Sequence, residues 1–371
     1  MKIKILITTI IIAIISTVII YVTHENSSII SSKPTIKIGV TLPLTGNLAS
    51  LGQSSKDSLE LAMNKLNKSK LRYNYKLIIE DDQFKPIVGS TNTQKLINVD
   101  KVSALLSFGS PVGNAVTSIS EKYSIPHING FASDPNVANG KFSYIHYTPA
   151  KEDVDLFIKV LQKKNIQRIT ILEQANNPGS KSIIDELKLK TSITNIKIDE
   201  IISVNGGDRD FRTILSKLRD SKTQLLVLII TTPELEIFTK QFYDFKIKIP
   251  ITSIEAFEFS DQLQLFEGNW YINGADPETW FINDFKDQYH YNPKFGAANM
   301  YDALFIIVNS IEKAGDGKDI PDYMAINREI GTLKNFDGAL GENLSMGENH
   351  MINSKAVVRI IKDGQPITIK Y

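Results

Sequence analysis

"LLSFGSPVGNAVTSISEKYSIP", residues 105–126, is the stretch that determines the fold class of this chain. An apolar run ends at Phe108, small polar residues fill 109–114, and apolar residues then return at helical spacing up to Tyr123. A strand that turns directly into a helix leaves unpaired backbone N–H groups at the helix start. The partial positive charge there suits an anion, and Ser110 adds a hydroxyl. The alternative is that Ser110 or Asn114 only caps its own helix.

Strands and helices alternate along most of the chain. The expected strands of the first run are 35–43, 75–81, 102–108 and 125–129. After a break near 147–153 the pattern restarts with strands 168–173, 196–203, 224–230 and 249–254. Strands separated by single helices predict parallel sheets, so the chain is expected to form two α/β lobes. Two further helices are expected at 277–289 and 297–315, and a hairpin about Asp363 and Gly364.

Composition excludes several classes of protein. The chain has 371 residues, 42% of them hydrophobic and 22% charged, as in an ordinary globular protein. The part after residue 32 has 40 basic and 40 acidic residues, which argues against a nucleic-acid partner. No cysteine is present, so disulfides, thiolate metal sites and cysteine nucleophiles are excluded.

The N-terminus has the layout of an export or membrane segment. Lys2 and Lys4 precede an apolar run over residues 5–22, and a polar, serine-rich stretch follows. The run is long for a signal and close to the ~20 residues of a spanning helix. Residues 1–32 are therefore expected to be a signal peptide or an anchor with a tether. In either case the remainder is exported, to the periplasm or the outer face of the cytoplasmic membrane.

Three segments in order resemble the leucine/isoleucine/valine-binding type of periplasmic binding protein. They are "IKIGVTLPLTGNLASLGQSSKDSLELAMNKLN", "IIEDDQFKPIVGSTNTQKLIN" and "LLSFGSPVGNAVTSISEKYSIPHINGFASDP". The resemblance continues through "NGGDRDFRTILSKLR", "NMYDALFIIVNSIEKAG" and "FDGALGENLSMGENH". It implies two Rossmann-like parallel-sheet lobes joined by a multi-strand hinge, which close over a ligand as a Venus flytrap. The expected lobes are 33–149 with 275–337 returning to it, and 150–274 with 338–371 returning to it.

The resemblance also implies an amino-acid site. Ser110 falls where the family's serine meets the ligand carboxylate, and Phe131 falls where a backbone group binds the ammonium. Ser133 stands where a Ser or Thr hydroxyl takes part, and Glu255 where an acidic residue faces the α-ammonium. This is coherent chemistry, because an amino acid needs an anion site and a carboxylate on opposite walls. The alternative for Glu255 is a surface residue at a strand end.

The sequence departs from the family where aromatic rings often line the side-chain pocket. The corresponding positions are Leu51, Pro178 and Thr232, none of them aromatic. The pocket is therefore expected to differ, being smaller or more polar, and the family also includes receptors for amides, urea and aromatic acids. Branched-chain specificity does not follow.

No enzyme class fits the sequence. There is no G-x-S-x-G elbow, no complete phosphate loop and no pair of histidines at helical metal-binding spacing. Neither a cofactor nor a metal is expected. The resulting interpretation is a receptor that captures an amino acid or related zwitterion or amide and delivers it to the permease subunits of an ABC importer. The alternative is a membrane-tethered sensor or assembly module with the same fold.

Overall fold

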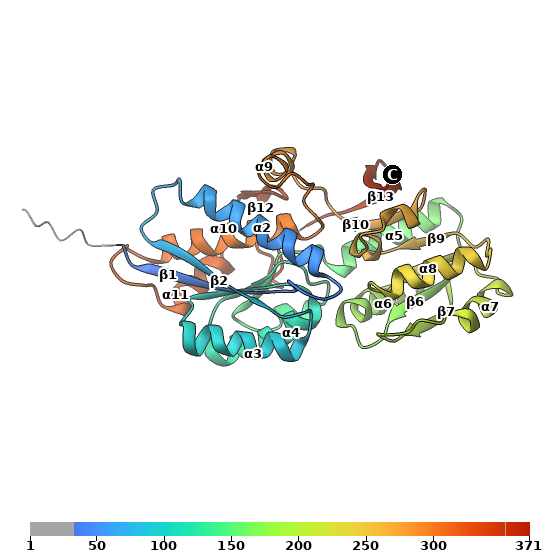
Figure 1. Cartoon of the computed structure of the whole chain (residues 1–371), viewed down its shortest axis with the longest axis horizontal. Coiled ribbons are helices and arrows are strands. Elements are labelled where there is room, and N and C mark those ends of the chain that lie inside the picture. The colour runs from blue at the N-terminus through green and yellow to red at the C-terminus, as the bar shows by residue number, and fades with distance from the viewer. Residues whose placement is uncertain (1–32, 353) are drawn as a thin grey trace, which may run out of the picture.

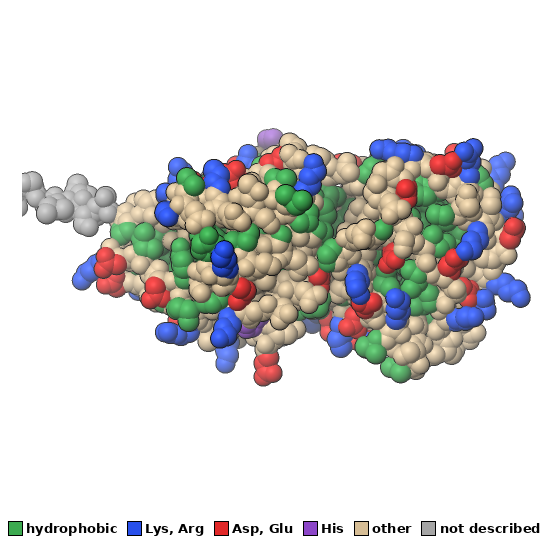
Figure 2. All heavy atoms as spheres, turned by 90° about the horizontal axis from the view of Figure 1, so that it is seen from below, with side chains coloured by type: hydrophobic (Ala, Val, Ile, Leu, Met, Phe, Trp, Pro, Cys, Tyr) green, Lys and Arg blue, Asp and Glu red, His purple; other side chains and the backbone are tan. Residues whose placement is uncertain are grey.

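The computed structural model describes residues 33–352 and 354–371, so the expected leader at 1–32 lies outside the described residues. The chain forms two α/β lobes that lie end to end along the long axis (Figure 1). Lobe 1 contains the N-terminal sheet, and lobe 2 contains the second sheet and the C-terminal hairpin. Figure 2 shows the lobes meeting along a seam, with acidic and basic side chains interspersed over the visible face.

The sheet of lobe 1 is wholly parallel, in the order β2-β1-β3-β4-β5. Its strands are β1 (Thr35–Leu42), β2 (Asn74–Asp81), β3 (Ala104–Ser107), β4 (His127–Asn129) and β5 (Ser143–Ile145). Both faces of β1 are buried, because Ile36, Ile38, Val40 and Leu42 on one side and Gly39 and Thr41 on the other are shielded from solvent. Helices must therefore cover both faces of the sheet.

Each face of this sheet has its own helices. The helices are α2 (Ala49–Leu66), α3 (Pro86–Lys95), α4 (Ser110–Tyr123), α9 (Thr279–Tyr289), α10 (Ala297–Ala314) and α11 (Tyr323–Gly331). α2 and α10 pack together on one face, while α3 and α4 pack on the other (Figure 1). A π-helical turn, η1 (Leu96–Asp100), extends α3 and places Leu96 and Ile97 in the core of the second face.

Lobe 2 repeats the design with a parallel sheet in the order β7-β6-β8-β9. Its strands are β6 (Arg168–Gln174), β7 (Lys197–Val204), β8 (Leu225–Ile229) and β9 (Ile251–Ser253), and its helices are α5 (Ala150–Lys163), α6 (Pro178–Thr191), α7 (Arg212–Arg219) and α8 (Glu234–Asp244). α5 and α6 cover one face and α7 and α8 the other. All five residues of β8 are buried, as expected for a central parallel strand. An antiparallel sheet of β10 (Trp270–Gly274), β13 (Ala356–Lys362) and β14 (Gln365–Ile369) adjoins it.

Three segments cross between the lobes, and they lie side by side. The hydroxyls of Thr148 and Ser354 are 3.1 Å apart, and the Ala275 N–H donates to the Lys355 carbonyl at 2.9 Å. A Cβ at Gly274 would lie 2.6 Å from the Thr148 hydroxyl, so this crossing needs a glycine. The three crossings form the expected hinge.

The expected return to lobe 2 at residue 338 is too early. Ala339, Met351 and Ile352 belong to the core of lobe 1, and a short hairpin of β11 (Phe336–Gly338) and β12 (Gly341–Leu344) lies beside them. The chain reaches lobe 2 only with β13, because the apolar side chains before it find their partners under α10 and α11.

Candidate functional site

A small cavity lies between the lobes at the carboxyl ends of both parallel sheets, where ligands bind in open α/β folds. Its volume is about 40 Å³. Lobe 1 supplies Leu48, Phe84, Gly109, Ser110, Pro111, Phe131 and Ser133, and lobe 2 supplies Asn177, Gly179, Ser180, Ile183, Ile229, Thr231, Ile254, Glu255, Ala256 and Phe259. Ser110 and Glu255 are each only 4% exposed, so a ligand can reach them only when the lobes part.

Four of the six predicted ligand-binding residues line this cavity: Ser110, Phe131, Ser133 and Glu255. The other two lie elsewhere. Leu51 is buried in the lobe 1 core, and the nearby Leu48 reaches the cavity instead. Thr232 donates its hydroxyl to Glu236 at 2.9 Å, while its neighbour Thr231 lines the cavity.

Two helix N-termini from opposite lobes meet at the cavity. Ser110 is the first residue of α4, and Gly109 before it has φ 80°, a conformation that favours glycine. α6 begins opposite, where the Asn177 side chain caps the N–H groups of Gly179 at 2.9 Å and Ser180 at 3.2 Å. A Cβ at Gly179 would lie 3.1 Å from the Ser110 hydroxyl oxygen, so the two ends are nearly in contact. Each end carries about half a positive charge, and together they favour an anion.

Glu255 occupies a strained turn on the lobe 2 side. Its φ is 65° and its ψ is −38°, and the Ala256 N–H donates to the Ile254 carbonyl at 2.8 Å across it. This is a γ-turn of the rare, strained form, and such strain costs on the order of 1–3 kcal/mol. The Glu255 N–H is held by the Ile272 carbonyl at 2.8 Å. Strain of this kind concentrates at functional sites, and here it directs a carboxylate into the interlobe space.

The Glu255 carboxylate is bound from the opposite lobe. The Ser133 hydroxyl lies 2.8 Å from one carboxylate oxygen and 3.1 Å from the other. Burial raises the pKa of Glu255 to about 7, and the hydrogen bond from Ser133 works against that rise. A positively charged donor beside Glu255 would therefore favour the ionised form of its carboxyl group.

A second carboxyl lies beside Glu255 and was missed in the sequence. Asp153 is completely buried in α5, and its pKa is raised well above the usual range, first by burial and then by Glu255. The signal was present, because Asp153 stands on the same helical face as the buried Phe157 and Leu161. An acid on an apolar stripe is rarely buried without a partner.

Aromatic and aliphatic side chains form much of the remaining lining of the cavity. Phe131 stacks on Phe108 with ring centroids 4.2 Å apart, and Phe259 from lobe 2 lies 5.9 Å from Phe131. Phe84 and Leu48 complete the lobe 1 side. Aromatic rings are thus supplied from positions other than those the resemblance indicated.

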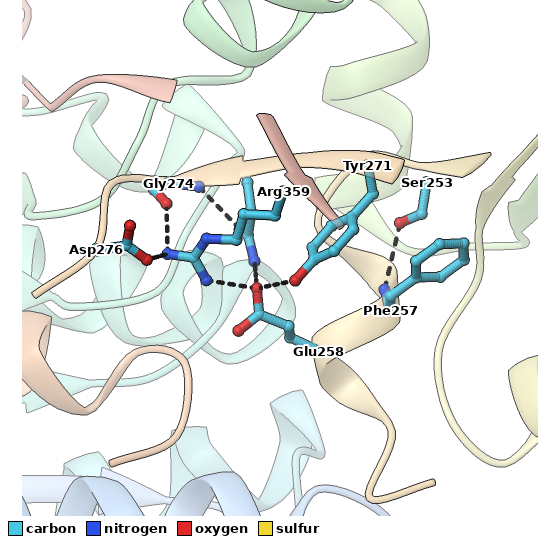
Figure 3. A network of polar contacts seen from close by, with 8 residues as sticks. Ser253, Phe257, Glu258, Tyr271, Gly274, Asp276 and Arg359 are labelled. Atoms are coloured by element: carbon cyan, nitrogen blue, oxygen red, sulfur yellow. Dashed lines mark hydrogen bonds and ion pairs between the residues drawn. The ribbon is translucent and has the colours of Figure 1, made fainter. Parts of the chain in front are cut away.

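A buried ion network anchors the turn that carries Glu255 (Figure 3). Arg359 on β13 donates to Glu258 at 2.6 Å, to the Gly274 carbonyl at 2.9 Å and to Asp276 at 2.8 Å. The same Glu258 oxygen accepts from Tyr271 at 2.8 Å and from Asn273 at 2.6 Å. The loop after Glu255 is therefore bound to both hinge strands of lobe 2, which fixes the position of the Glu255 turn.

Within residues 33–352 and 354–371, no cluster of three or more His, Asp or Glu side chains could hold a metal ion. In the same part of the chain, no helix has the length and apolar character to cross a membrane.

Comparison with known proteins agrees with this architecture. A family described as periplasmic binding protein matches residues 35–365. The Leu/Ile/Val-binding protein homolog 3 of Brucella melitensis is 22% identical over 331 residues, covering 80% of this chain and 86% of the relative. The isoleucine complex of the Streptococcus pneumoniae branched-chain amino acid transporter substrate-binding protein LivJ superposes with a TM-score of 0.80 at 18% identity, covering 91% of this chain and all of that one.

A solute-binding protein of an ABC transporter from R. palustris, in complex with benzoate, has the same TM-score of 0.80 at 17% identity. The superposition covers 90% of this chain and 95% of the benzoate-bound protein. The family match spans nearly all of the described residues, and the fold with parallel sheets in two lobes is shared with solved structures of the leucine- and branched-chain-amino-acid-binding type. The chain belongs to the periplasmic binding protein family, as a type I member similar to the Leu/Ile/Val-binding proteins.

Proposed function

We propose that this protein is a non-catalytic receptor that captures a small zwitterion, with an amino acid as the first candidate, and delivers it to an ABC importer. One observation carries the proposal: two helix N-termini and a buried carboxylate face one cavity from opposite sides. The ligand carboxylate is bound between Ser110 and the N-terminus of α6. The ligand ammonium is bound by Glu255, with the Phe131 carbonyl and the Ser133 hydroxyl.

Lobe closure follows from the same arrangement. A ligand favours the closed form only through contacts that the open form lacks. Ser110 and Ser133 belong to lobe 1, and Glu255 belongs to lobe 2, so a bound zwitterion joins the lobes by charge. The apolar lining from Phe84, Phe131 and Phe259 then receives an apolar side chain.

The alternative functions differ in what they predict for the N-terminal segment, the importer and the ligand. A tethered sensor or assembly module would keep the ligand site and the uncleaved N-terminal segment, without an importer. A receptor for aromatic acids is the second candidate for the ligand, supported by the aromatic lining and by the relative that binds benzoate.

The test is a thermal-shift screen of the purified full chain against L-amino acids, their amides, urea and aromatic carboxylates including benzoate. The proposal expects stabilisation by one group of amino acids and none by the matched acids without the amino group. Stabilisation by benzoate alone would replace the zwitterion with an aromatic acid. Stabilisation by no compound in the panel would overturn the receptor function.

The location is proposed to be outside the cytoplasmic membrane. A cleaved signal predicts a mature chain that begins between Tyr21 and Lys33, and intact-mass measurement of exported protein decides this. A mass that includes Met1 would favour an anchor, and protein found only in the cytoplasm would contradict export.

A further inference from the structure

Asp153 lies buried behind Glu255 with no apparent source of hydrogen bonds. Both of its carboxylate oxygens are inaccessible to solvent, and neither meets a donor among the described residues. Its closest ionisable neighbour is Glu255, whose carboxyl faces it. The hydroxyl of Tyr147 is likewise buried beside the same pair, and it faces Glu255. Each of these groups would cost several kcal/mol if left unsatisfied.

No basic side chain of the described residues acts on either carboxyl. The groups that act on the pair are the Ser133 hydroxyl, the Tyr147 phenol and the carboxylate of Glu152, and Asp153 itself lies in the first turn of α5. Two adjacent buried carboxyls cannot both be ionised in such a place, so the pair must hold a proton. That proton would satisfy an oxygen of Asp153 and, at the same time, give Glu255 a second donor besides Ser133.

The environment also determines which residue holds the proton. Ser133 stabilises the ionised form of Glu255 through two contacts, and Asp153 has no equivalent. Accordingly, the pKa of Asp153 is raised well above the usual range, while that of Glu255 is raised only to about 7. The proton belongs on Asp153 at neutral pH.

We propose that Asp153 is a positioning residue, a protonated carboxyl that donates a hydrogen bond to Glu255 and leaves the site with a single negative charge. This inference rests on the proposed function in one respect, since it deepens the ligand class: one negative charge matches one ammonium, not a dication. Asp153 need not touch the ligand, because its effect passes through the orientation and ionisation of Glu255.

The test uses infrared difference spectra of the ligand-free full chain, with Asp153→Asn and Asp153→Ala as matched variants. Asparagine keeps an N–H donor toward Glu255, and alanine removes it. At pH 8.5 the native protein should show a buried protonated-carboxyl band that both variants lose. Asp82, another buried acid whose pKa is raised, to about 6, stays in every variant and cancels in the difference.

Titration of Glu255, identified by the signal lost in Glu255→Gln, then reports on positioning. Half-protonation should stay near pH 7 in the native protein and in Asp153→Asn, and should rise by about one pH unit in Asp153→Ala. The proposal is overturned if the native spectrum has no protonated-carboxyl band that disappears in Asp153→Asn. It is also overturned if the titration of Glu255 is the same in Asp153→Ala as in the native protein. Neither readout uses a ligand, so the two proposals can fail separately. If the infrared band behaves as expected but the protein binds no amino acid, the proposed function is refuted and the role of Asp153 is not.

Discussion

Amino-acid binding should weaken about ninetyfold when the pH falls from 8 to 5, because protons compete with the ligand ammonium for Glu255. In the closed, ligand-free protein the pKa of Glu255 is about 7, so about nine-tenths of the sites are ionised at pH 8 and about one in a hundred at pH 5. The bound ammonium keeps Glu255 ionised throughout this range. The free protein therefore takes up a proton that the complex excludes, and affinity falls as the pH drops through 7.

The ratio of ionised fractions, about ninetyfold, corresponds to ~2.7 kcal/mol of binding free energy. Calorimetric titrations at pH 5, 6, 7 and 8 with the amino acid found in the screen measure it, with thermal melts at each pH to show that the fold persists. Glu255→Gln is the control, since it keeps the shape of the side chain and removes the titrating charge.

In Glu255→Gln the affinity at pH 8 should fall at least about thirtyfold, the lower part of the ~2–5 kcal/mol lost when a buried charged pair loses one partner. Its remaining affinity should not change with pH. The matched ligand without an amino group should bind the variant as well as it binds the native protein, or better. A native affinity that is constant from pH 5 to 8, or a pH dependence that survives in Glu255→Gln, would refute this account of Glu255.

Four further substitutions test the site and its supports. Ser110→Ala should weaken binding of a carboxylate ligand by ~1–2 kcal/mol in calorimetry and leave the thermal stability of the empty protein unchanged; a large loss of stability at unchanged affinity would make Ser110 a cap only. Gly179→Ala brings a methyl group 3.1 Å from the Ser110 hydroxyl oxygen, so the closed form must shift by a few tenths of an ångström and ligand binding should weaken in calorimetry; an unchanged affinity would contradict the closed contact. Burial lowers the pKa of His127 to about 3, so His127 is protonated at a higher pH in the unfolded state than in the folded state. The free energy of unfolding should therefore fall as the pH drops below about 6.5. Urea unfolding at pH 4.5 and 7.5 measures this fall, which should be smaller in His127→Gln. Arg359→Leu should lower the free energy of unfolding, measured in urea, by ~3–5 kcal/mol, because it leaves the buried Glu258 without its cation. The double variant with Glu258→Gln should recover part of this free energy. No recovery would mean that packing, not charge, explains the loss.

The regular elements could be predicted because they depend on local periodicity. The strands β1 to β4 and β6 to β9, the helix α10 and the hairpin at Asp363 and Gly364 lie where spacing and turn residues indicated, and both hairpin residues have positive φ. The short strand β5 and the strand β10 were not predicted. α11 was not predicted, and the 338–352 segment was assigned to the wrong lobe. Both are held by the apolar surface of α10, which is a partner distant in sequence.

The site was predictable only where a residue is fixed by its own loop. Ser110 and Glu255 directly follow strand ends, so counting along the motif leads to residues that line the cavity. Leu51 and Thr232 were chosen by the same counting, but the direction of a side chain on a helix or before a proline depends on its contacts. Asp153 is an acid in an otherwise apolar helical face. Its role could not be predicted, because it depends on Glu255, which is about a hundred residues later in the sequence and lies against it.

The position of α10 has a consequence for the order in which the chain matures. The five strands of the first sheet are complete at Ile145, yet one of their faces is covered only in part, by α2, until residues 297–314 arrive. Lobe 2 lies almost entirely between these two stretches and has its own core, so it can condense first. An intermediate with a formed second lobe and a partly covered first sheet is thus the expected species during synthesis, and it exposes apolar surface that favours aggregation. Chains that end before Ala314 should accumulate in that form, as substrates for chaperones and proteases.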